Sequence, residues 1–186
     1  MIDFPLHTTD TAPDASRPVL EGVQNKYGFA PNLFKVFAEA PATIQAYAQL
    51  SDAFQKTSLS ATEQQVVLLT ASLLNECNYC MAAHSTVAKG AGVPDDILTA
   101  LRDAEPLPDA KLDALRKFTA VIVQKRGWAS EEDIDAFVSA GYGKGAILEV
   151  ITGVALKTIS NYTNHIAETP VDDAFAGQTW IAPSKR

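Results

Sequence analysis

Two cysteines and a histidine near the middle of the sequence carry its clearest chemical signal. Cys77, Cys80 and His84 form a C-x-x-C-x-x-x-H pattern. On an α-helix, Cys80 and His84 lie one turn apart on the same face, and Cys77 lies near that face. Thiols three residues apart can reach the distance of a disulfide when the first helical turn relaxes slightly. The imidazole can accept a thiol proton, directly or through one water molecule, and the start of a helix favours a thiolate.

A nucleophilic thiol, a second thiol and a nearby base are the groups that a disulfide-cycling peroxidase requires. One thiolate attacks the oxygen–oxygen bond of a peroxide and becomes a sulfenic acid, and the other thiol condenses with it and releases water. The spacing does not decide which cysteine attacks, because Cys80 is nearer to His84 whereas Cys77 is nearer to the helix end. The pattern therefore predicts thiol redox chemistry with the order of the two cysteines left open.

Of the other interpretations of these residues, a zinc site and a purely structural role stay open, whereas a c-type haem is excluded and a thioredoxin fold is not favoured. A zinc site could use both thiols and His84, but it would need a fourth ligand from His165, His7 or a carboxylate. A covalent c-type haem requires a histidine directly after the second cysteine, where this chain has Met81. A thioredoxin fold requires a preceding strand, whereas the segment before the cysteines is predicted to be helical. The purely structural alternative is a pair of buried apolar thiols beside a hydrogen-bonded histidine.

Helix signals dominate the elements that must position these residues. Residues 60–63 form a capping box before the apolar run 66–74, which favours a helix that is buried on most sides, within the chain or against a second subunit. Further helix starts are expected at Ser16, Pro31, Pro41, the cysteine pair, Pro94, Asp109, Ser130 and Gly145. No segment shows the alternation of a sheet, so the sequence predicts an all-α fold of about eight helices.

The predicted organisation is a single helical domain between two extensions. Residues 1–14 are expected to form an N-terminal arm in which His7 is solvated. Residues 15–169 form the helical domain, and residues 170–186 form a C-terminal extension.

Length, composition and charge narrow the function classes. The 186 residues, 47% of them apolar and 20% charged, suit one globular domain. Fifteen Lys and Arg against 22 Asp and Glu give a net charge of −7, which argues against nucleic-acid binding. The start of the chain lacks the pattern of a secretory signal, and no apolar run is long enough to span a membrane. We therefore expect a cytoplasmic protein with no membrane partner.

Residues 59–93, LSATEQQVVLLTASLLNECNYCMAAHSTVAKGAGV, resemble the core of the carboxymuconolactone decarboxylase family. The resemblance is to its AhpD-like alkylhydroperoxidase branch, because the decarboxylase branch typically lacks the cysteine pair. It extends to APNLFKVFAEAP at residues 30–41 and to NYTNHIAETPVDDAF at residues 161–175.

The resemblance implies an all-helical subunit that assembles into trimers or hexamers. It implies reduction of organic hydroperoxides or hydrogen peroxide without a cofactor, with a dithiol reductant of the lipoyl or thioredoxin type. In the family's terms Cys80 attacks the peroxide, Cys77 resolves the sulfenic acid, and His84 relays protons. A lactone decarboxylase or isomerase that uses His84 as acid and base, and a non-enzymatic thiol redox sensor, are the alternative functions.

Two positions depart from the family pattern and bear on the proton relay. Gln65 stands where the family often has a glutamate, and an amide can orient an imidazole but cannot take a proton. Tyr79 stands where some relatives have a histidine between the cysteines, and a phenol is a weaker base at neutral pH. The relay is therefore expected to consist of His84 and water, or to be completed by Glu76 or His165. The simpler interpretation of His165 is a histidine favoured by the dipole at a helix C-terminus.

Overall fold

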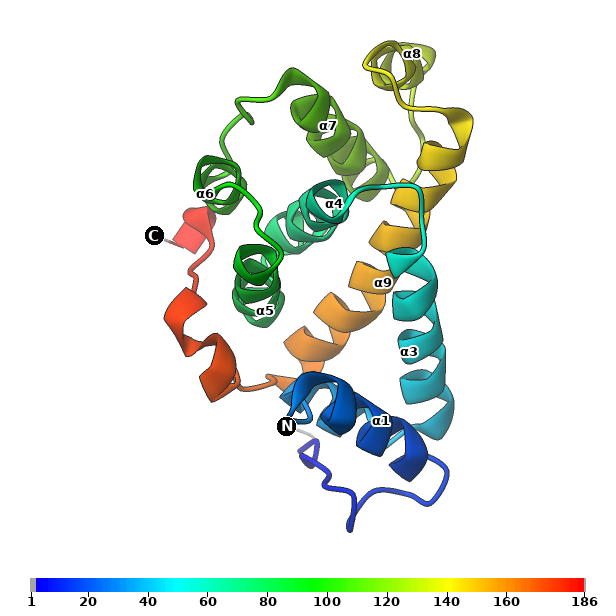
Figure 1. Cartoon of the computed structure of the whole chain (residues 1–186), viewed down its shortest axis with the longest axis vertical. Helices are drawn as coiled ribbons and strands as arrows, with labels where there is room; N and C mark the ends of the chain where they lie inside the picture. Colours follow the sequence, from blue (N-terminus) through cyan, green and yellow to red (C-terminus); the bar gives the residue numbers. More distant parts are fainter. Residues whose placement is uncertain (1–2, 186) are drawn as a thin grey trace.

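The computed structural model describes residues 3–185, which are built from helices and connecting turns (Figure 1). The α-helices of this range are α1 (Arg17–Tyr27), α2 (Asn32–Phe37), α3 (Pro41–Gln55), α4 (Ala61–Leu74), α5 (Asn78–Gly90), α6 (Asp95–Asp103), α7 (Ala110–Gln124), α8 (Glu131–Ser139) and α9 (Lys144–Ala167), followed by the 3-10 helices η1 (Asp173–Gln178) and η2 (Pro183–Lys185). Apart from the six-residue α2, each α-helix has at least nine residues. The predicted all-α fold of about eight helices is confirmed. No helix within residues 3–185 is long and apolar enough to cross a membrane.

Helix α4 lies at the centre of the fold (Figure 1). The predicted capping box begins it, since the Glu63 backbone N–H donates to Ser60 Oγ and the Ser60 N–H donates to the Glu63 carboxylate. Helices α5, α7 and α9 pack around it, and every residue from 65 to 72 is buried. The other helices of the chain therefore bury these residues of α4, as expected for a helix that is buried on most sides.

Helix α9 crosses α3 and α4 at a glycine. A Cβ atom at Gly153 would lie 2.7 Å from both a ring carbon of Phe54 and a methyl carbon of Val67. Only glycine allows this close approach without a shift of the neighbours. The crossing carries the following turns of α9 towards α5, and there the buried face of α9 becomes polar at Lys157, Ser160, Asn161 and Asn164.

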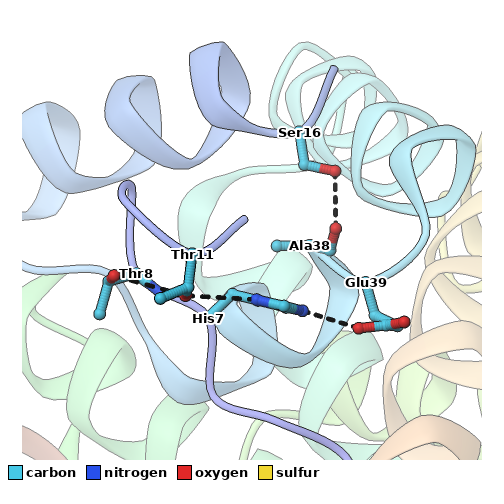
Figure 2. Close-up of polar contacts among 6 residues, drawn as sticks. All are labelled: His7, Thr8, Thr11, Ser16, Ala38 and Glu39. Atoms are coloured by element: carbon cyan, nitrogen blue, oxygen red, sulfur yellow. Dashed lines mark hydrogen bonds and ion pairs between the residues drawn. The ribbon is translucent and has the colours of Figure 1, made fainter. Parts of the chain in front are cut away.

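The predicted helix caps are partly confirmed. Asp109 and Ser130 accept hydrogen bonds from the first turns of α7 and α8, as expected for N-cap residues. Gly28 ends α1 with a left-handed backbone, φ 79°. Ser16 precedes α1 but makes no capping bond, because its hydroxyl donates to the backbone oxygen of Ala38 at 2.7 Å (Figure 2).

The described part of the N-terminal arm contains no helix, yet it is held against the helical body (Figure 2). Nε2 of His7 lies 2.7 Å from a carboxylate oxygen of Glu39, and Nδ1 lies 3.3 Å from the hydroxyl of Thr11. The side chain of His7 is only 11% exposed, and Ala12 is part of the core. The prediction of a solvated His7 is therefore wrong, because Glu39 and Thr11 enclose the ring.

The C-terminal extension turns back beside α5 and ends near α6 (Figure 1). The indole N–H of the buried Trp180 donates to the backbone oxygen of Arg102 at 2.8 Å. The Arg102 guanidinium donates in turn to the backbone oxygens of Gln178 and Thr179. These bonds fasten the extension over the helix that carries the cysteines.

Candidate active site

The two cysteines lie where α4 gives way to α5. Cys77 is the N-cap residue of α5 and Cys80 lies in its first turn. Both are free thiols with 1% of their surface exposed. Glu76, directly before them, has a left-handed backbone with φ 51°, which turns the chain from one helix into the next.

One amide of α9 contacts both sulfurs. Nδ2 of Asn164 lies 3.2 Å from Sγ of Cys80 and 3.8 Å from Sγ of Cys77. One turn earlier, Oγ of Ser160 lies 3.7 Å from Sγ of Cys80. The two sulfurs therefore converge on a single buried point, and polar side chains of α9 surround it.

The imidazole of His84 is held between Lys157 and Gln65. Nζ of Lys157 lies 2.9 Å from Nε2, and Oε1 of Gln65 lies 3.2 Å from Nδ1. An ammonium can only donate, so Nε2 accepts a hydrogen bond from Lys157. Nδ1 therefore carries the ring hydrogen and donates it in a hydrogen bond to Gln65. Burial, and after it the charge of Lys157, lower the pKa of His84 well below its usual value. The ring is therefore neutral at pH 7, and both its nitrogens are already hydrogen-bonded.

Lys157, like Ser160 and Asn164, is a site residue that the sequence analysis missed. Its side chain is fully buried, and within residues 3–185 no carboxylate oxygen lies at ion-pair distance from it. The available signal was the helical spacing of polar residues at 157, 160, 161 and 164 in an otherwise apolar helix. Polar groups on a buried helix face need partners, so such a stripe indicates a polar site.

The surroundings shift the pKa values of the two thiols in opposite directions. Burial alone would raise the pKa of Cys80, but the hydrogen bond from Cys77, the charge of Lys157 and the Ser160 hydroxyl outweigh it and lower that pKa well below its usual value. The hydrogen bond to Cys80, together with burial, raises the pKa of Cys77. Burial also opposes the charge of Lys157, yet negative charge at Cys80 and Tyr47 raises the pKa of that ammonium. The environment thus favours a Cys80 thiolate beside a Lys157 ammonium.

A cavity of about 190 Å³ borders Cys80. Its lining includes His84 and Lys157 together with Cys80, but not Cys77. Much of the remaining wall is aromatic and consists of Tyr27, Phe29, Phe34, Tyr47, Tyr79 and Phe175. A mainly apolar pocket with a few convergent polar groups is typical of a small-molecule site.

Residues 38–120, which include both cysteines and His84, match the model of the Carboxymuconolactone decarboxylase family. The chain is similar to this family over that segment, which is slightly less than half of its length. A comparison with curated proteins gives no match.

Similar solved structures show the fold of the chain to be AhpD-like. A peroxidase-related protein with an alkylhydroperoxidase AhpD core from Ralstonia eutropha JMP134 has a TM-score of 0.84 and 21% identity, over 92% of this chain and 93% of its own. A peroxidase-related protein from Silicibacter sp. TM1040 has a TM-score of 0.80 and 21% identity, over 95% and 94%. A cysteine-to-alanine variant of the debrominase Bmp8, in complex with 2,3,4-tribromopyrrole, has a TM-score of 0.79 and 17% identity, over 96% and 95%.

Tyr79, which departs from the family pattern, belongs to the cavity wall. Its hydroxyl donates to the Asp172 carboxylate at 2.6 Å and accepts from the Leu33 backbone N–H at 3.2 Å. Burial and the hydrogen bond to Asp172 raise the pKa of Tyr79, so the phenol is no base at neutral pH. Asp172 also accepts from the backbone N–H of Asn32, and it thereby joins the C-terminal extension to α2 across the cavity wall.

Two of the predicted relay residues, Glu76 and His165, are engaged elsewhere or exposed. The Glu76 carboxylate accepts a hydrogen bond from Ser184 and pairs with Lys185 at 3.3 Å. His165 is exposed in the last turn of α9. Glu76 is engaged by the C-terminal extension and His165 faces outward, which corrects the prediction that either completes the relay. Gln65 is the predicted relay residue that does reach His84.

The zinc interpretation gains no support from these positions. Within residues 3–185 no group of three or more His, Cys, Asp or Glu side chains could hold a metal ion. His165 is exposed, and His7 is bonded to Glu39 in the arm.

Proposed function

We propose that this protein is a thiol-dependent peroxidase that reduces organic hydroperoxides or hydrogen peroxide through a Cys77/Cys80 dithiol–disulfide cycle. The observation that carries the proposal is the convergence of both sulfurs on the Asn164 amide beside a cavity that reaches Cys80. The match of residues 38–120 to the family model and the AhpD-like fold support it.

Cys80 is the proposed attacking thiol, because it borders the cavity and has the lowered pKa. Its thiolate sulfur attacks one peroxide oxygen, the O–O bond breaks, and the products are a sulfenic acid and an alkoxide. The alkoxide is protonated by the polar group that His84 and Lys157 form. Cys77 then attacks the Cys80 sulfur, and the sulfenic oxygen leaves as water while the disulfide forms.

A dithiol of the lipoyl or thioredoxin type is the proposed reductant. It reduces the Cys77–Cys80 disulfide to two thiols and is itself oxidised to a disulfide. We place the reaction in the cytoplasm, where such reductants keep cysteines reduced.

The proposed assembly is a homo-oligomer, a trimer or a hexamer as the family resemblance implies. The support is an apolar stripe on the outer face of α9, where Leu148 is 65%, Tyr162 54% and Ile166 69% exposed. Apolar side chains that follow one helix face in this way mark a protein contact. Light scattering should give a mass that is a multiple of three subunits, and a monomeric mass would exclude the assembly.

Peroxide consumption with dithiothreitol tests the proposed function. The native protein should turn over many equivalents of cumene hydroperoxide, and Cys80→Ser should abolish turnover. In a separate single-turnover reaction without dithiothreitol, Cys77→Ser should consume one equivalent of peroxide and stop with a sulfenic acid that dimedone traps, because no second thiol resolves it. His165→Ala is the matched control and should behave as the native protein. Turnover that survives in the Cys77→Ser/Cys80→Ser double variant would reject the mechanism.

Reductive dehalogenation is a second candidate function, favoured by the aromatic walls of the cavity beside Cys80. Bmp8, a debrominase seen with a brominated pyrrole, has a similar fold. In the balanced reaction an aryl halide and the dithiol give the arene, a halide ion, a proton and the disulfide. Bromide release from a brominated pyrrole, measured beside peroxide consumption on the same preparation, separates the two candidates.

A further inference from the structure

We propose that Lys157 holds Cys80 as a thiolate and then protonates the oxygen that leaves the peroxide. The first half concerns the resting thiol and needs no substrate. The second half rests on the proposed function, since only a peroxide offers a leaving oxygen. The sequence pattern points to His84 for both tasks, whereas the geometry points to the lysine.

Lys157 is a buried charge that needs a negative partner. Its side chain is fully buried, and within residues 3–185 no carboxylate lies at ion-pair distance. The titratable groups around its ammonium are Tyr47 of α3 and Cys77, Cys80 and His84 of α5. An unpaired buried ammonium is costly, so the thiolate of Cys80 is the counter-ion that this arrangement requires.

The position of Lys157 in the cavity suits contact with a bound peroxide. Lys157 and Cys80 line the same cavity, so a peroxide placed against the sulfur lies beside the ammonium. Ser160 and Asn164, on the next two turns of α9, also contact the Cys80 sulfur. The helix therefore directs a cation and two polar groups at one thiol.

His84 is a positioning residue in this account. Its Nε2 accepts from Lys157 and its Nδ1 donates to Gln65, so both nitrogens are occupied and neither is free to take the Cys80 proton. The ring instead directs the ammonium. Gln65 serves this role better than a glutamate would, because an amide oxygen accepts the Nδ1 hydrogen without drawing the proton away.

The proposed step is balanced in atoms and electrons. The Cys80 thiolate forms a bond to one peroxide oxygen, the O–O bond breaks, and sulfur is oxidised by two electrons while the peroxide is reduced. The leaving alkoxide takes a proton from the Lys157 ammonium, which gives an alcohol and a neutral amine. After the reductant restores both thiols, the Cys80 thiol returns a proton to that amine and the ion pair forms again.

The pH dependence of Cys80 alkylation by iodoacetamide tests whether Lys157 holds Cys80 as a thiolate. All variants carry Cys77→Ser, so that only one thiol reacts, and the midpoint is the pH at which the alkylation rate is half of its maximum. Lys157→Met should raise the midpoint by about one to three pH units, the effect of removing a nearby opposite charge. His84→Gln should leave the midpoint within half a unit of the parent. A midpoint raised by His84→Gln and unmoved by Lys157→Met would overturn the proposal.

Folding of the lysine variant is expected, because the Cys80 thiolate can take up a proton once the ammonium is absent, so that no unpaired charge stays buried. Lys157→Gln is the second variant should the methionine variant fail to fold. His165→Ala, an exposed change on the same helix, should leave the alkylation profile and the peroxide turnover unchanged.

The leaving group of the substrate tests the second half. Cumene hydroperoxide releases an alkoxide that needs a proton, whereas perbenzoic acid releases a carboxylate that does not. Both carry one aromatic ring, so binding effects largely cancel. Lys157→Met should lower kcat/KM for cumene hydroperoxide about 100-fold more than for perbenzoic acid, as expected for the loss of a general acid. Equal losses on both substrates would overturn the proton donation.

The two assays separate this inference from the proposed function. Native protein that alkylates at low pH but consumes no peroxide would reject the peroxidase function and the proton donation, and would support the thiolate pair. Native protein that consumes peroxide while Lys157→Met keeps its alkylation midpoint would support the peroxidase and reject the role of Lys157.

Discussion

At the scale of single residues, the account turns on which polar groups face each sulfur. Cys80 meets the Asn164 amide at 3.2 Å, whereas Cys77 meets the same nitrogen at 3.8 Å. Only Cys80 of the pair borders the cavity. The shorter amide contact and the cavity beside Cys80 support the proposed order, in which Cys80 is the attacking thiol.

Replacement of Asn164 should weaken the thiolate without removing a charge. Asn164→Leu keeps a side chain of similar shape and deletes the donor to both sulfurs. Because a hydrogen bond to a charged group contributes about 1.5–3 kcal/mol, the alkylation midpoint of Cys80 should rise by about one to two pH units. Iodoacetamide kinetics against pH measure this shift, with His165→Ala as the unaffected control. An unmoved midpoint would mean that the amide does not stabilise the thiolate.

At the scale of helices, the site depends on the crossing of α9 with α3 and α4. The crossing at Gly153 is tight because the ring of Phe54 and a methyl group of Val67 fill the space of a Cβ atom. The polar stripe of α9 begins one turn later, so any displacement of the crossing also moves Lys157 and Asn164.

Gly153→Ala should destabilise the fold by about 1–3 kcal/mol, the range expected for overpacking a core. Gly145→Ala is the matched control in the same helix, where an added Cβ meets nothing within 4 Å. It should be neutral or stabilise by up to about 1 kcal/mol, because alanine favours helix over glycine. Thermal unfolding of both variants measures the difference, and equal midpoints would contradict the tight crossing.

The Asp113 carboxylate connects α7 to the loop before it, and its charge is lost when the carboxylate is protonated at low pH. Its carboxylate accepts from the Leu107 backbone N–H and pairs with Arg116 and Lys117 at 2.7 and 2.9 Å. Burial opposes the charge, but these contacts outweigh it and lower the pKa of Asp113. A lowered folded pKa stabilises the protein above the unfolded value, near 3.9, and this stabilisation is lost as the pH falls through the folded value.

The free energy of unfolding in urea should therefore be about 1–3 kcal/mol lower for Asp113→Asn than for the native protein at pH 7. The difference should shrink as the pH is lowered below about 4, because the native carboxyl then gains a proton too. A difference that is independent of pH would show that the charge of Asp113 is not what matters.

Much of the helical pattern was predictable because its signals are local. The capping box at residues 60–63, the caps Asp109 and Ser130, and Gly28 all act within one turn of the helix they begin or end. Ser16 failed as a cap because its hydroxyl bonds to Ala38, a partner 22 residues away that no local pattern reveals.

The candidate site was predictable only in the part that α5 carries. Cys77, Cys80 and His84 share one helix, so their spacing implied their proximity. Lys157 and Asn164 come from α9, some 80 residues later. They reach His84 and Cys80 respectively because α9 crosses the fold at Gly153. Glu76 was misjudged because the C-terminal extension, not the thiols, binds its carboxylate.

At the scale of the whole molecule, the N-terminal arm and the C-terminal extension both pack against the helical body. The N-terminal arm is fixed through His7 and Glu39 (Figure 2), and the C-terminal extension covers α5 (Figure 1). Phe175 of that extension lines the cavity and packs edge-on against Phe29 and Tyr79. The extension therefore forms part of the cavity wall.

Asp172→Ala should loosen the extension and spoil the cavity for large substrates. Loss of the hydrogen bonds to Tyr79 and Asn32 should raise KM for cumene hydroperoxide about tenfold, which corresponds to about 1.4 kcal/mol, and should change KM for hydrogen peroxide little. Asp173→Ala, at the neighbouring exposed residue, is the control and should leave the KM of both substrates unchanged. Equal effects on both substrates would contradict a role of the extension in shaping the cavity.

The most direct test of the central claim is the mass of the intact chain after one equivalent of peroxide. The account predicts that the reduced protein loses two hydrogens per chain. Peptide mapping should then show a disulfide between Cys77 and Cys80. A chain that gains one oxygen at Cys80 and keeps it, or that is unchanged while peroxide persists, would contradict the dithiol–disulfide cycle.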